Sequence, residues 1–278
     1  MSFTLGYNTN GFPHHRLEDA IDILAEIGYR SVGITLDYHH LNPFEQNLST
    51  RVAEVRSRLD RHRMTCVIET GARFLLDPRR KHQPTLMDIE PAARKKRLEF
   101  LKLAVSIARD LNSNVVSIWS GVKPGGVSDD QASMQLLKAY ADLLEFASQK
   151  SDQISIAWEP EPGMHIERLS QYESLRLRNF EPSFHLTLDI GHIHCLNDGD
   201  PAERIGEFAF DLRNVHIEDM RRGVHEHLMF GEGEMDFPPI FAALREVNYE
   251  GGVYVELSRH GHDAVNAAKK SFDFLSKL

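Results

Sequence analysis

The sequence lacks several features that would place it in a specialised class of protein. Its only two cysteines, Cys66 and Cys195, lie far apart and in no metal-binding spacing. Such sparse cysteine usage argues against a disulfide-rich secreted protein and favours a reduced, cytoplasmic setting. No run of about 18 apolar residues occurs, so we expect no membrane span. The first residues show no charged segment followed by an apolar one, so we expect no signal peptide.

The chain also lacks a surplus of basic residues. It carries 32 Lys and Arg against 41 Asp and Glu, which gives a formal net charge of −9. Proteins that bind nucleic acid usually show a basic surplus, so we expect no nucleic-acid partner. The hydrophobic fraction of 41% and the charged fraction of 26% are typical of a soluble globular chain and exclude wholesale disorder.

The sequence does contain a regular alternation of strand-like and helix-like segments. Short apolar segments rich in β-branched residues have the pattern of buried strands. They span residues 4–7, 31–36, 65–69, 115–119, 154–158, 185–188, 214–217 and 252–256. Segments with helical spacing of apolar residues lie between them, at 17–27, 97–108, 136–147, 240–247 and 264–275.

This alternation predicts a single (β/α)₈ TIM barrel that forms one domain over residues 1–278. Strands that alternate with helices pair in parallel through right-handed crossovers, and eight such units close into a barrel. The alternative is an open, doubly wound sheet, which normally carries a glycine-rich first turn. The first turn here, residues 8–12, has no GxGxxG pattern, and no Pro-, Gly- or Ser-rich linker divides the chain.

Metal-ligand side chains stand at the ends of four successive predicted strands. They are Glu159, Asp189, His216 and Glu256. In a barrel of this kind the strands end at one face, which carries the active site. Neighbouring strands are about 4.8 Å apart, so these side chains can reach a common ion. Three carboxylates and one imidazole suit Mn²⁺ or Mg²⁺, with Co²⁺, Fe²⁺ or Zn²⁺ as alternatives.

The second half of the chain resembles the xylose isomerase-like TIM barrels, a superfamily that includes sugar isomerases and epimerases. The motifs that carry the resemblance are LDIGH at 188–192, VHIED at 215–219, GEGE at 231–234 and YVEL at 254–257. The resemblance implies that the four residues above bind one divalent metal. It also implies that Glu159 and Glu256 transfer protons. Glu161 competes with Glu159 for the role on the fifth strand, and Glu159 is preferred because it directly follows the apolar run.

Further residues are expected to position a substrate. By the resemblance, His192 and Arg222 contact substrate. His225 and His227 lie two residues apart, so an extended loop would place both on one face, and we expect His227 to contact substrate as well. Trp119, at the end of the fourth strand, can form an apolar wall against a sugar ring.

A basic segment follows the third predicted strand. Arg73 and the run Asp-Pro-Arg-Arg-Lys-His at 77–82 concentrate positive charge there. A phosphate or carboxylate on the substrate would find matching charge, and a solvated loop is the alternative. The segment from about residue 70 to residue 90 is also longer than the usual βα loop, which favours a functional role.

The residues and the resemblance together predict a metal-dependent isomerase or epimerase of a sugar or related polyhydroxylated carbonyl compound, acting through a metal-stabilised enediolate. One alternative is a dehydratase of an inosose or dehydroshikimate-type substrate, and another is a non-catalytic barrel that binds a partner. An endonuclease IV-like hydrolase is disfavoured because the strands ending at Glu69 and Trp119 lack the histidines of that branch's three-zinc cluster. His225 and His227 match part of a later motif of that branch. The sequence leaves open whether the protein forms a homodimer.

Overall fold

A closed barrel of parallel strands forms the centre of the molecule in the computed structural model, which describes residues 3–151, 153–179 and 183–278. The strands are β1 (Thr4–Asn8), β2 (Ser31–Thr35), β3 (Thr65–Glu69), β4 (Val115–Trp119), β5 (Ser155–Glu159), β6 (His185–Asp189), β7 (Leu212–Ile217) and β10 (Gly252–Val255). Around the barrel their order is β1-β10-β7-β6-β5-β4-β3-β2. The predicted (β/α)₈ barrel is confirmed.

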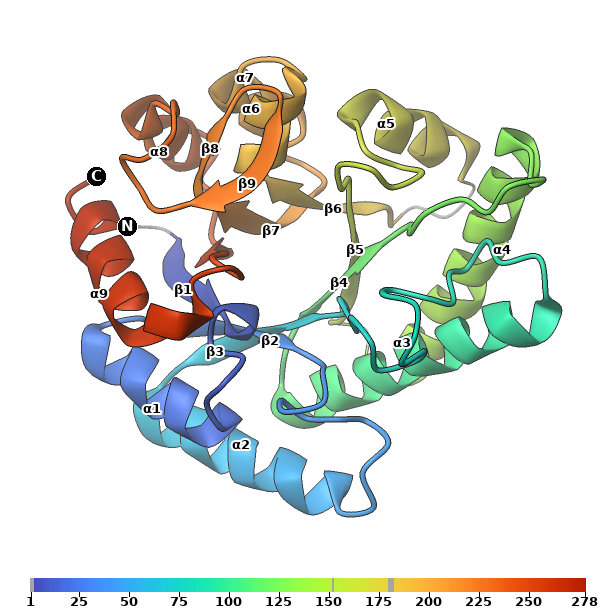
Figure 1. Ribbon diagram of the computed structural model, residues 1–278, viewed down its shortest axis with the longest axis horizontal. Helices are drawn as coiled ribbons and strands as arrows, with labels where there is room; N and C mark the ends of the chain where they lie inside the picture. Colours follow the sequence, from blue (N-terminus) through green and yellow to red (C-terminus); the bar gives the residue numbers. More distant parts are fainter. Residues whose placement is uncertain (1–2, 152, 180–182) are drawn as a thin grey trace.

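Helices surround the strands as an outer ring (Figure 1). They are α1 (Leu17–Ile27), α2 (Leu48–His62), α3 (Pro91–Leu111), α4 (Asp129–Ser148), α5 (Leu169–Arg178), α6 (Ile190–Leu196), α7 (Pro201–Glu207), α8 (Phe237–Glu246) and α9 (Ala264–Leu275). The predicted helix 136–147 was too short, because α4 begins at a capping box in which Ser128 and Gln131 bond each other's backbone. The helix predicted at 97–108 likewise extends back to Pro91, a residue favoured in the first turn.

The interior of the barrel is built in layers, because alternate residues of a strand point inward. The bottom layer is apolar and consists of Val67, Val115, Ala157 and Tyr254. Two positions further along these four strands the residues are polar, namely Glu69, Ser117, Glu159 and Glu256. The strands therefore change from apolar to polar side chains as they approach their C-terminal ends.

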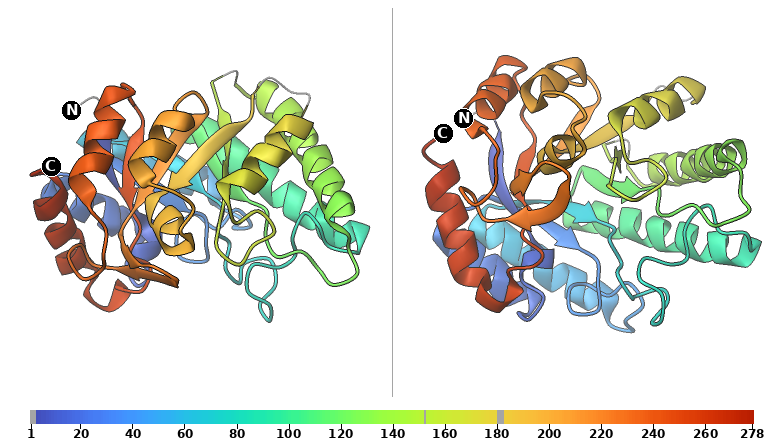
Figure 2. Two further views of the ribbon diagram at one scale, coloured as in Figure 1. Left: turned by 90° about the horizontal axis from the view of Figure 1, so that it is seen from above. Right: turned by 45° about the horizontal axis from the view of Figure 1, so that its top comes forward.

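Two segments extend beyond the strands at the end of the barrel where these polar residues lie. One is the antiparallel hairpin of β8 (Asp219–Arg221) and β9 (Val224–Leu228), and the other is the segment 70–90 between β3 and α3. Both lie along the lower side of the left view in Figure 2. Among the described residues, no helix is both long and apolar enough to cross a membrane.

Candidate active site

The predicted metal ligands come together at the C-terminal ends of the strands. Glu159, Asp189, His216 and Glu256 each offer one ligand atom, and these atoms all lie within 4.8 Å of one another. Glu159 and Asp189 are the last residues of β5 and β6, His216 lies one residue before the end of β7, and Glu256 follows β10. The barrel thus places residues from four neighbouring strands around one point. That they bind a metal stays a prediction.

His216 lies between carboxylates on both sides of its ring. Its Nδ1 is 2.9 Å from Glu159 Oε1 and 3.0 Å from Glu256 Oε2. Its Nε2 is 3.0 Å from Oε1 of Glu69, the last residue of β3. Burial lowers the pKa of His216, but the three carboxylates outweigh burial and raise this pKa well above its usual value.

The pKa values of the two predicted proton-transfer residues are shifted in opposite directions. Burial raises the pKa of Glu159 to about 8. Burial also acts to raise the pKa of Glu256, but the charge of His216 and its hydrogen bond hold that pKa well below its usual range. Paired carboxyl groups whose environments separate their pKa values are typical of an acid and a base that work together.

The donor set fits a divalent cation. Asp189 is buried, its Oδ1 accepts a hydrogen bond from the backbone N–H of His192, and its Oδ2 has no hydrogen-bond partner among the described residues. Buried carboxylate oxygens rarely remain unpaired, and several carboxylates so close together repel one another. A hard or borderline cation would satisfy the free oxygen and relieve the repulsion.

Glu256 is oriented by residues from the start of the chain. Asn10 Nδ2 donates to Glu256 Oε1 at 2.7 Å, and Asn8 Nδ2 donates to Oε2 at 3.3 Å. The sequence analysis did not identify these asparagines or Glu69 as site residues. For Glu69 a signal was available, because this acidic residue ends a predicted strand in the same way as Glu159 does.

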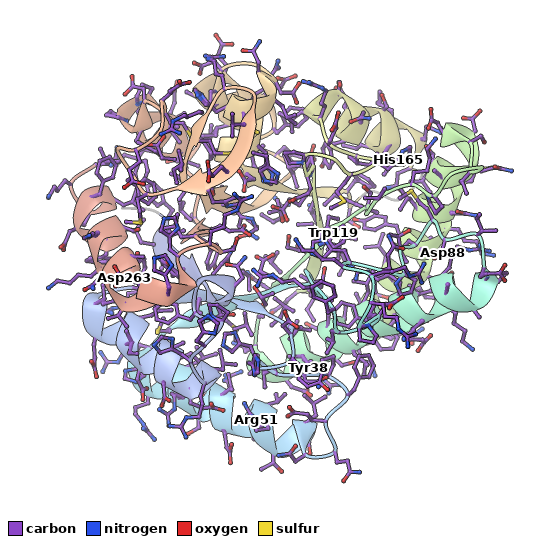
Figure 3. All side chains as sticks on the ribbon, in the orientation of Figure 1. Tyr38, Arg51, Asp88, Trp119, His165 and Asp263 are labelled. Atoms are coloured by element: carbon purple, nitrogen blue, oxygen red, sulfur yellow. The ribbon has the colours of Figure 1, made fainter. Side chains whose placement is uncertain are left out.

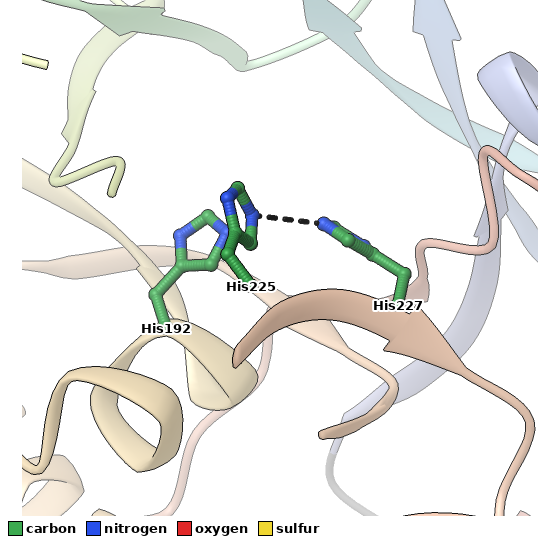
Figure 4. Close-up of side chains that lie close together, drawn as sticks. All are labelled: His192, His225 and His227. Carbon is green, nitrogen blue, oxygen red and sulfur yellow. Dashed lines mark hydrogen bonds between the residues drawn. The ribbon is translucent and has the colours of Figure 1, made fainter. Parts of the chain in front are cut away.

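Three imidazoles near the carboxylates lie close to one another, and Figure 4 shows these three side chains. His192 of α6 and His225 and His227 of β9 each offer a nitrogen, and these nitrogens lie within 4.8 Å of one another. His192 Nδ1 donates to the carbonyl of Pro160 at 3.2 Å, and His227 Nδ1 donates to the carbonyl of Glu256 at 2.8 Å. His192 therefore keeps its Nε2 lone pair available for a cation or a substrate hydroxyl, whereas Nε2 of His227 forms a hydrogen bond of 3.2 Å with Nε2 of His225.

Glu161 lies close to this histidine group. Its Oε2 is 3.8 Å from His192 Nε2, and Glu159, Glu161 and His192 form a further set that could hold a cation. Only Glu159 also belongs to the set with Asp189, His216 and Glu256. This arrangement favours Glu159 over Glu161, and its role as the ligand from β5 stays a prediction.

A cavity of about 180 Å³ opens above the carboxylates. Among the residues predicted to bind substrate, Trp119 and His227 line it, and Trp119 lies near the centre of the molecule in Figure 3. His192 faces Asp189, with 3.5 Å between Nε2 and Oδ2. Arg222 is exposed and donates a hydrogen bond to Asn197, and it is not among the described residues that line the cavity. Its substrate contact stays a prediction that this geometry does not support.

The similarities to known proteins agree with this architecture. The relative L-ribulose-5-phosphate 3-epimerase UlaE of Shigella flexneri serotype 5b (strain 8401) is 25% identical over 229 residues, which cover 79% of each chain. The structure of a D-allulose 3-epimerase from Methylomonas sp. superposes with a TM-score of 0.79 at 20% identity, covering 99% of this chain and 97% of the other. That of 3-keto-D-glucoside 4-epimerase YcjR from E. coli gives a TM-score of 0.79 at 15% identity, covering 99% and 100%.

At such identities the solved structures show that the fold is shared. The family model described as xylose isomerase-like TIM barrel matches residues 21–278, which is most of the chain. The chain belongs to the xylose isomerase-like TIM barrel family.

Proposed function

We propose that this protein is a divalent-metal-dependent isomerase or epimerase of a sugar or a related polyhydroxylated carbonyl compound. The observation that carries the proposal is the pair Glu159 and Glu256, whose carboxylates both lie within 3.0 Å of His216 Nδ1 beneath the cavity. The names of a relative, L-ribulose-5-phosphate 3-epimerase, and of a structural neighbour, D-allulose 3-epimerase, support the same class of reaction.

Glu159, Asp189, His216 and Glu256 would hold the ion, with Mn²⁺ or Mg²⁺ preferred by three oxygen ligands. When bound, such an ion supplies Lewis-acid polarisation of a substrate carbonyl. Polarisation of that carbonyl weakens the C–H bond on the neighbouring carbon, which is the bond that an isomerase or epimerase must break.

The two glutamates supply the proton transfers. One carboxylate oxygen takes the proton from the carbon next to the carbonyl, and the C–H electron pair moves into an enediolate. The other glutamate then returns a proton. Delivery to the opposite face of the same carbon gives an epimer, and delivery to the adjacent carbon gives an aldose–ketose isomer. Asn8 and Asn10 keep Glu256 in a fixed orientation during this transfer.

Deuterium exchange tests the proposal directly. The protein, loaded in turn with Mn²⁺, Mg²⁺, Co²⁺ or Zn²⁺, is incubated in D₂O with D-allulose, L-ribulose or L-ribulose 5-phosphate, and NMR follows deuterium at the carbon next to the carbonyl. We expect exchange with at least one ketose, and a loss of at least about 100-fold in Glu256→Gln. Glu54→Gln, on the exposed face of α2, is the matched control and should keep the wild-type rate.

Two results would contradict the proposal. One is the absence of exchange with every combination of ketose and metal. The other is a Glu256→Gln variant that exchanges as fast as Glu54→Gln. A product that has lost a hydroxyl group would instead identify the reaction as a dehydration.

A further inference from the structure

The cavity is lined by two kinds of charge that come from different parts of the chain. Carboxylates at the strand ends, among them Glu159 and Glu256, line it together with Arg73 and Lys81 from the segment 70–90. The protein has a net charge of −9, so acidic partners for these cations are plentiful elsewhere in the sequence. Their position beside the cavity therefore needs a physical explanation.

The two cations that the segment 70–90 contributes to the cavity have no acidic partners within the described parts of the chain, whereas Arg259, which also lines the cavity, pairs with Glu226 at 3.4 Å. Neither Arg73 nor Lys81 forms an ion pair there, whereas Arg80 of the same segment pairs with Asp77 at 2.7 Å. Unpaired positive charge that faces a cavity attracts anions and raises their local concentration. Arg73 and Lys81 are thus available to a ligand, and Arg80 is not.

A third cation lies buried behind the wall of the cavity. Arg97 of α3 is 2% exposed, donates to the carbonyl of Thr70 at 3.2 Å, and lies 4.7 Å from the ring centre of Trp119. Its Nη1 has no hydrogen-bond partner among the described residues, and burial lowers the pKa of the guanidinium to about 10. Thr70 and Trp119 both line the cavity, so a buried charge without a counter-ion acts directly through that wall.

His82, which also lines the cavity, is subject to the positive charges of Arg73, Lys81 and Arg97 together. Its ring packs against Trp119 with 4.9 Å between the ring centres. Burial, followed by the charges of Lys81, Arg97 and Arg73, lowers the pKa of His82 to about 3. The imidazole is therefore neutral at physiological pH and adds no charge of its own. Because Lys81, Arg97 and Arg73 all lower its pKa, their positive potentials overlap at this ring.

The backbone of this segment is held in a strained conformation. The backbone N–H of His82 donates to the carbonyl of Arg73 at 2.6 Å, which fixes the two ends of the basic segment together. Ala72 and His82 have φ angles of 43° and 65°, in the left-handed region that non-glycine residues rarely adopt. Strain of this kind concentrates at ligand-binding sites.

We propose that the substrate carries a terminal anionic group, either a phosphate monoester or a carboxylate, and that Arg73 and Lys81 bind it. The inference rests on the proposed function and specifies its class of substrate. Arg97 strengthens the positive potential at this end of the cavity, and the strand-end carboxylates repel an anionic group from the other end. A ligand with one anionic end therefore enters in one orientation, with its carbonyl end toward Glu159 and Glu256.

Paired substrates and a matched loop variant test this proposal. L-ribulose 5-phosphate, D-tagaturonate and unphosphorylated L-ribulose are compared in the exchange assay with the Mn²⁺-loaded protein. We expect kcat/KM for at least one anionic ketose to exceed that for L-ribulose at least tenfold. This ratio should fall at least tenfold in Arg73→Gln and in Lys81→Gln, mainly through KM. Arg79→Gln is the control, because Arg79 is exposed in the same segment and does not line the cavity.

A second readout does not depend on turnover. Calorimetry with inorganic phosphate should give weaker binding in Arg73→Gln and Lys81→Gln than in Arg79→Gln. Equal kcat/KM values for anionic and neutral ketoses would overturn the inference and leave the proposed function intact. If no ketose exchanges, the proposed function fails, and the phosphate titration then decides the anion site alone: equal binding in all the variants would overturn it.

Discussion

Nε2 of His216 lies 3.0 Å from Oε1 of Glu69, while Nδ1 of the same ring faces Glu159 and Glu256. Asn214 Nδ2 donates to the same Glu69 oxygen at 2.9 Å and fixes it in place. A carboxylate that accepts from one nitrogen of a histidine leaves the lone pair of the other nitrogen free and makes it more basic. Glu69 is therefore a positioning residue for the predicted metal ligand His216.

This relationship predicts that Glu69→Gln weakens binding of Mn²⁺ about 10- to 100-fold, the usual effect of removing such a partner. The shape of the side chain is conserved, so the loss arises from the missing negative charge. Isothermal titration with Mn²⁺ measures it, and Glu54→Gln serves as the control for removal of a distant carboxylate. An affinity in Glu69→Gln equal to that of the control would contradict the orienting role.

Asp219 organises the loop that follows the hairpin. Its carboxylate is 1% exposed and accepts backbone N–H groups from Gly231, Gly233 and Met235 at 2.8 to 3.2 Å. We expect Asp219→Ala to lower the free energy of unfolding by about 3 kcal/mol, because the buried donors lose a charged acceptor. Urea denaturation measures the change. Asp236→Ala, whose carboxylate is exposed and makes no capping bond, should cost less than about 1 kcal/mol, and similar losses in both variants would refute the anchor role.

Because Gly191 has no side chain, the buried carboxyl group of Glu218 can occupy the space beside it. A Cβ at Gly191 would come within 1.9 Å of Glu218 Oε1 and 2.9 Å of Met220 Cε. We predict that Gly191→Ala destabilises the fold by about 1–3 kcal/mol through this overlap. In the Glu218→Ala background the same substitution should cost much less. Additive losses in a double-mutant cycle would show that the two residues do not share this space.

A second glycine provides the control for that experiment. Nothing lies within 4 Å of a Cβ built at Gly206, which belongs to α7. Gly206→Ala should therefore stabilise the protein by about 0.5–1 kcal/mol, because alanine loses less backbone entropy in a helix.

His82 makes the stability of the protein sensitive to acid. Burial and the neighbouring cations lower its pKa from 6.5 to about 3 in the folded chain. Between these two pH values the unfolded chain binds the proton and the folded chain does not, so the free energy of unfolding falls as the pH falls. The stabilising contribution is complete above pH 6.5 and is lost progressively toward pH 3.

Denaturation of the wild type and of His82→Phe between pH 8 and pH 4 tests this point. Phenylalanine retains a ring beside Trp119 but cannot take up a proton. The difference in unfolding free energy between the two proteins should shift against the wild type as the pH decreases. A difference that stays constant over this range would contradict the assignment.

The main features of the fold and the acidic centre could be predicted from the sequence because their signals are local. A strand that ends in Glu159 or Asp189 is visible in a short stretch of residues. The helix α2 was not predicted, since its four arginines, Glu54 and Asp60 obscure a narrow buried stripe made by Val52, Val55 and Leu59.

The asparagines that orient Glu256 could not be predicted for a different reason. Asn10 and Glu256 are 246 positions apart in the chain, and they meet only because β1 pairs with β10 when the barrel closes. The family resemblance implied that Arg222 contacts substrate, whereas in the folded hairpin its side chain donates a hydrogen bond to Asn197.

The predicted ion ligands and the basic segment come from different parts of the barrel. The predicted ion ligands belong to β5, β6, β7 and the residue after β10, whereas the basic segment 70–90 joins β3 to α3 and contributes no ligand to that set. The segment can therefore be exchanged without removing any of these predicted ion ligands, which makes it a suitable target for protein engineering. We expect that replacing it with the corresponding segment of another barrel, or randomising it in a library, changes the substrate preference and leaves the predicted proton-transfer residues Glu159 and Glu256 in place.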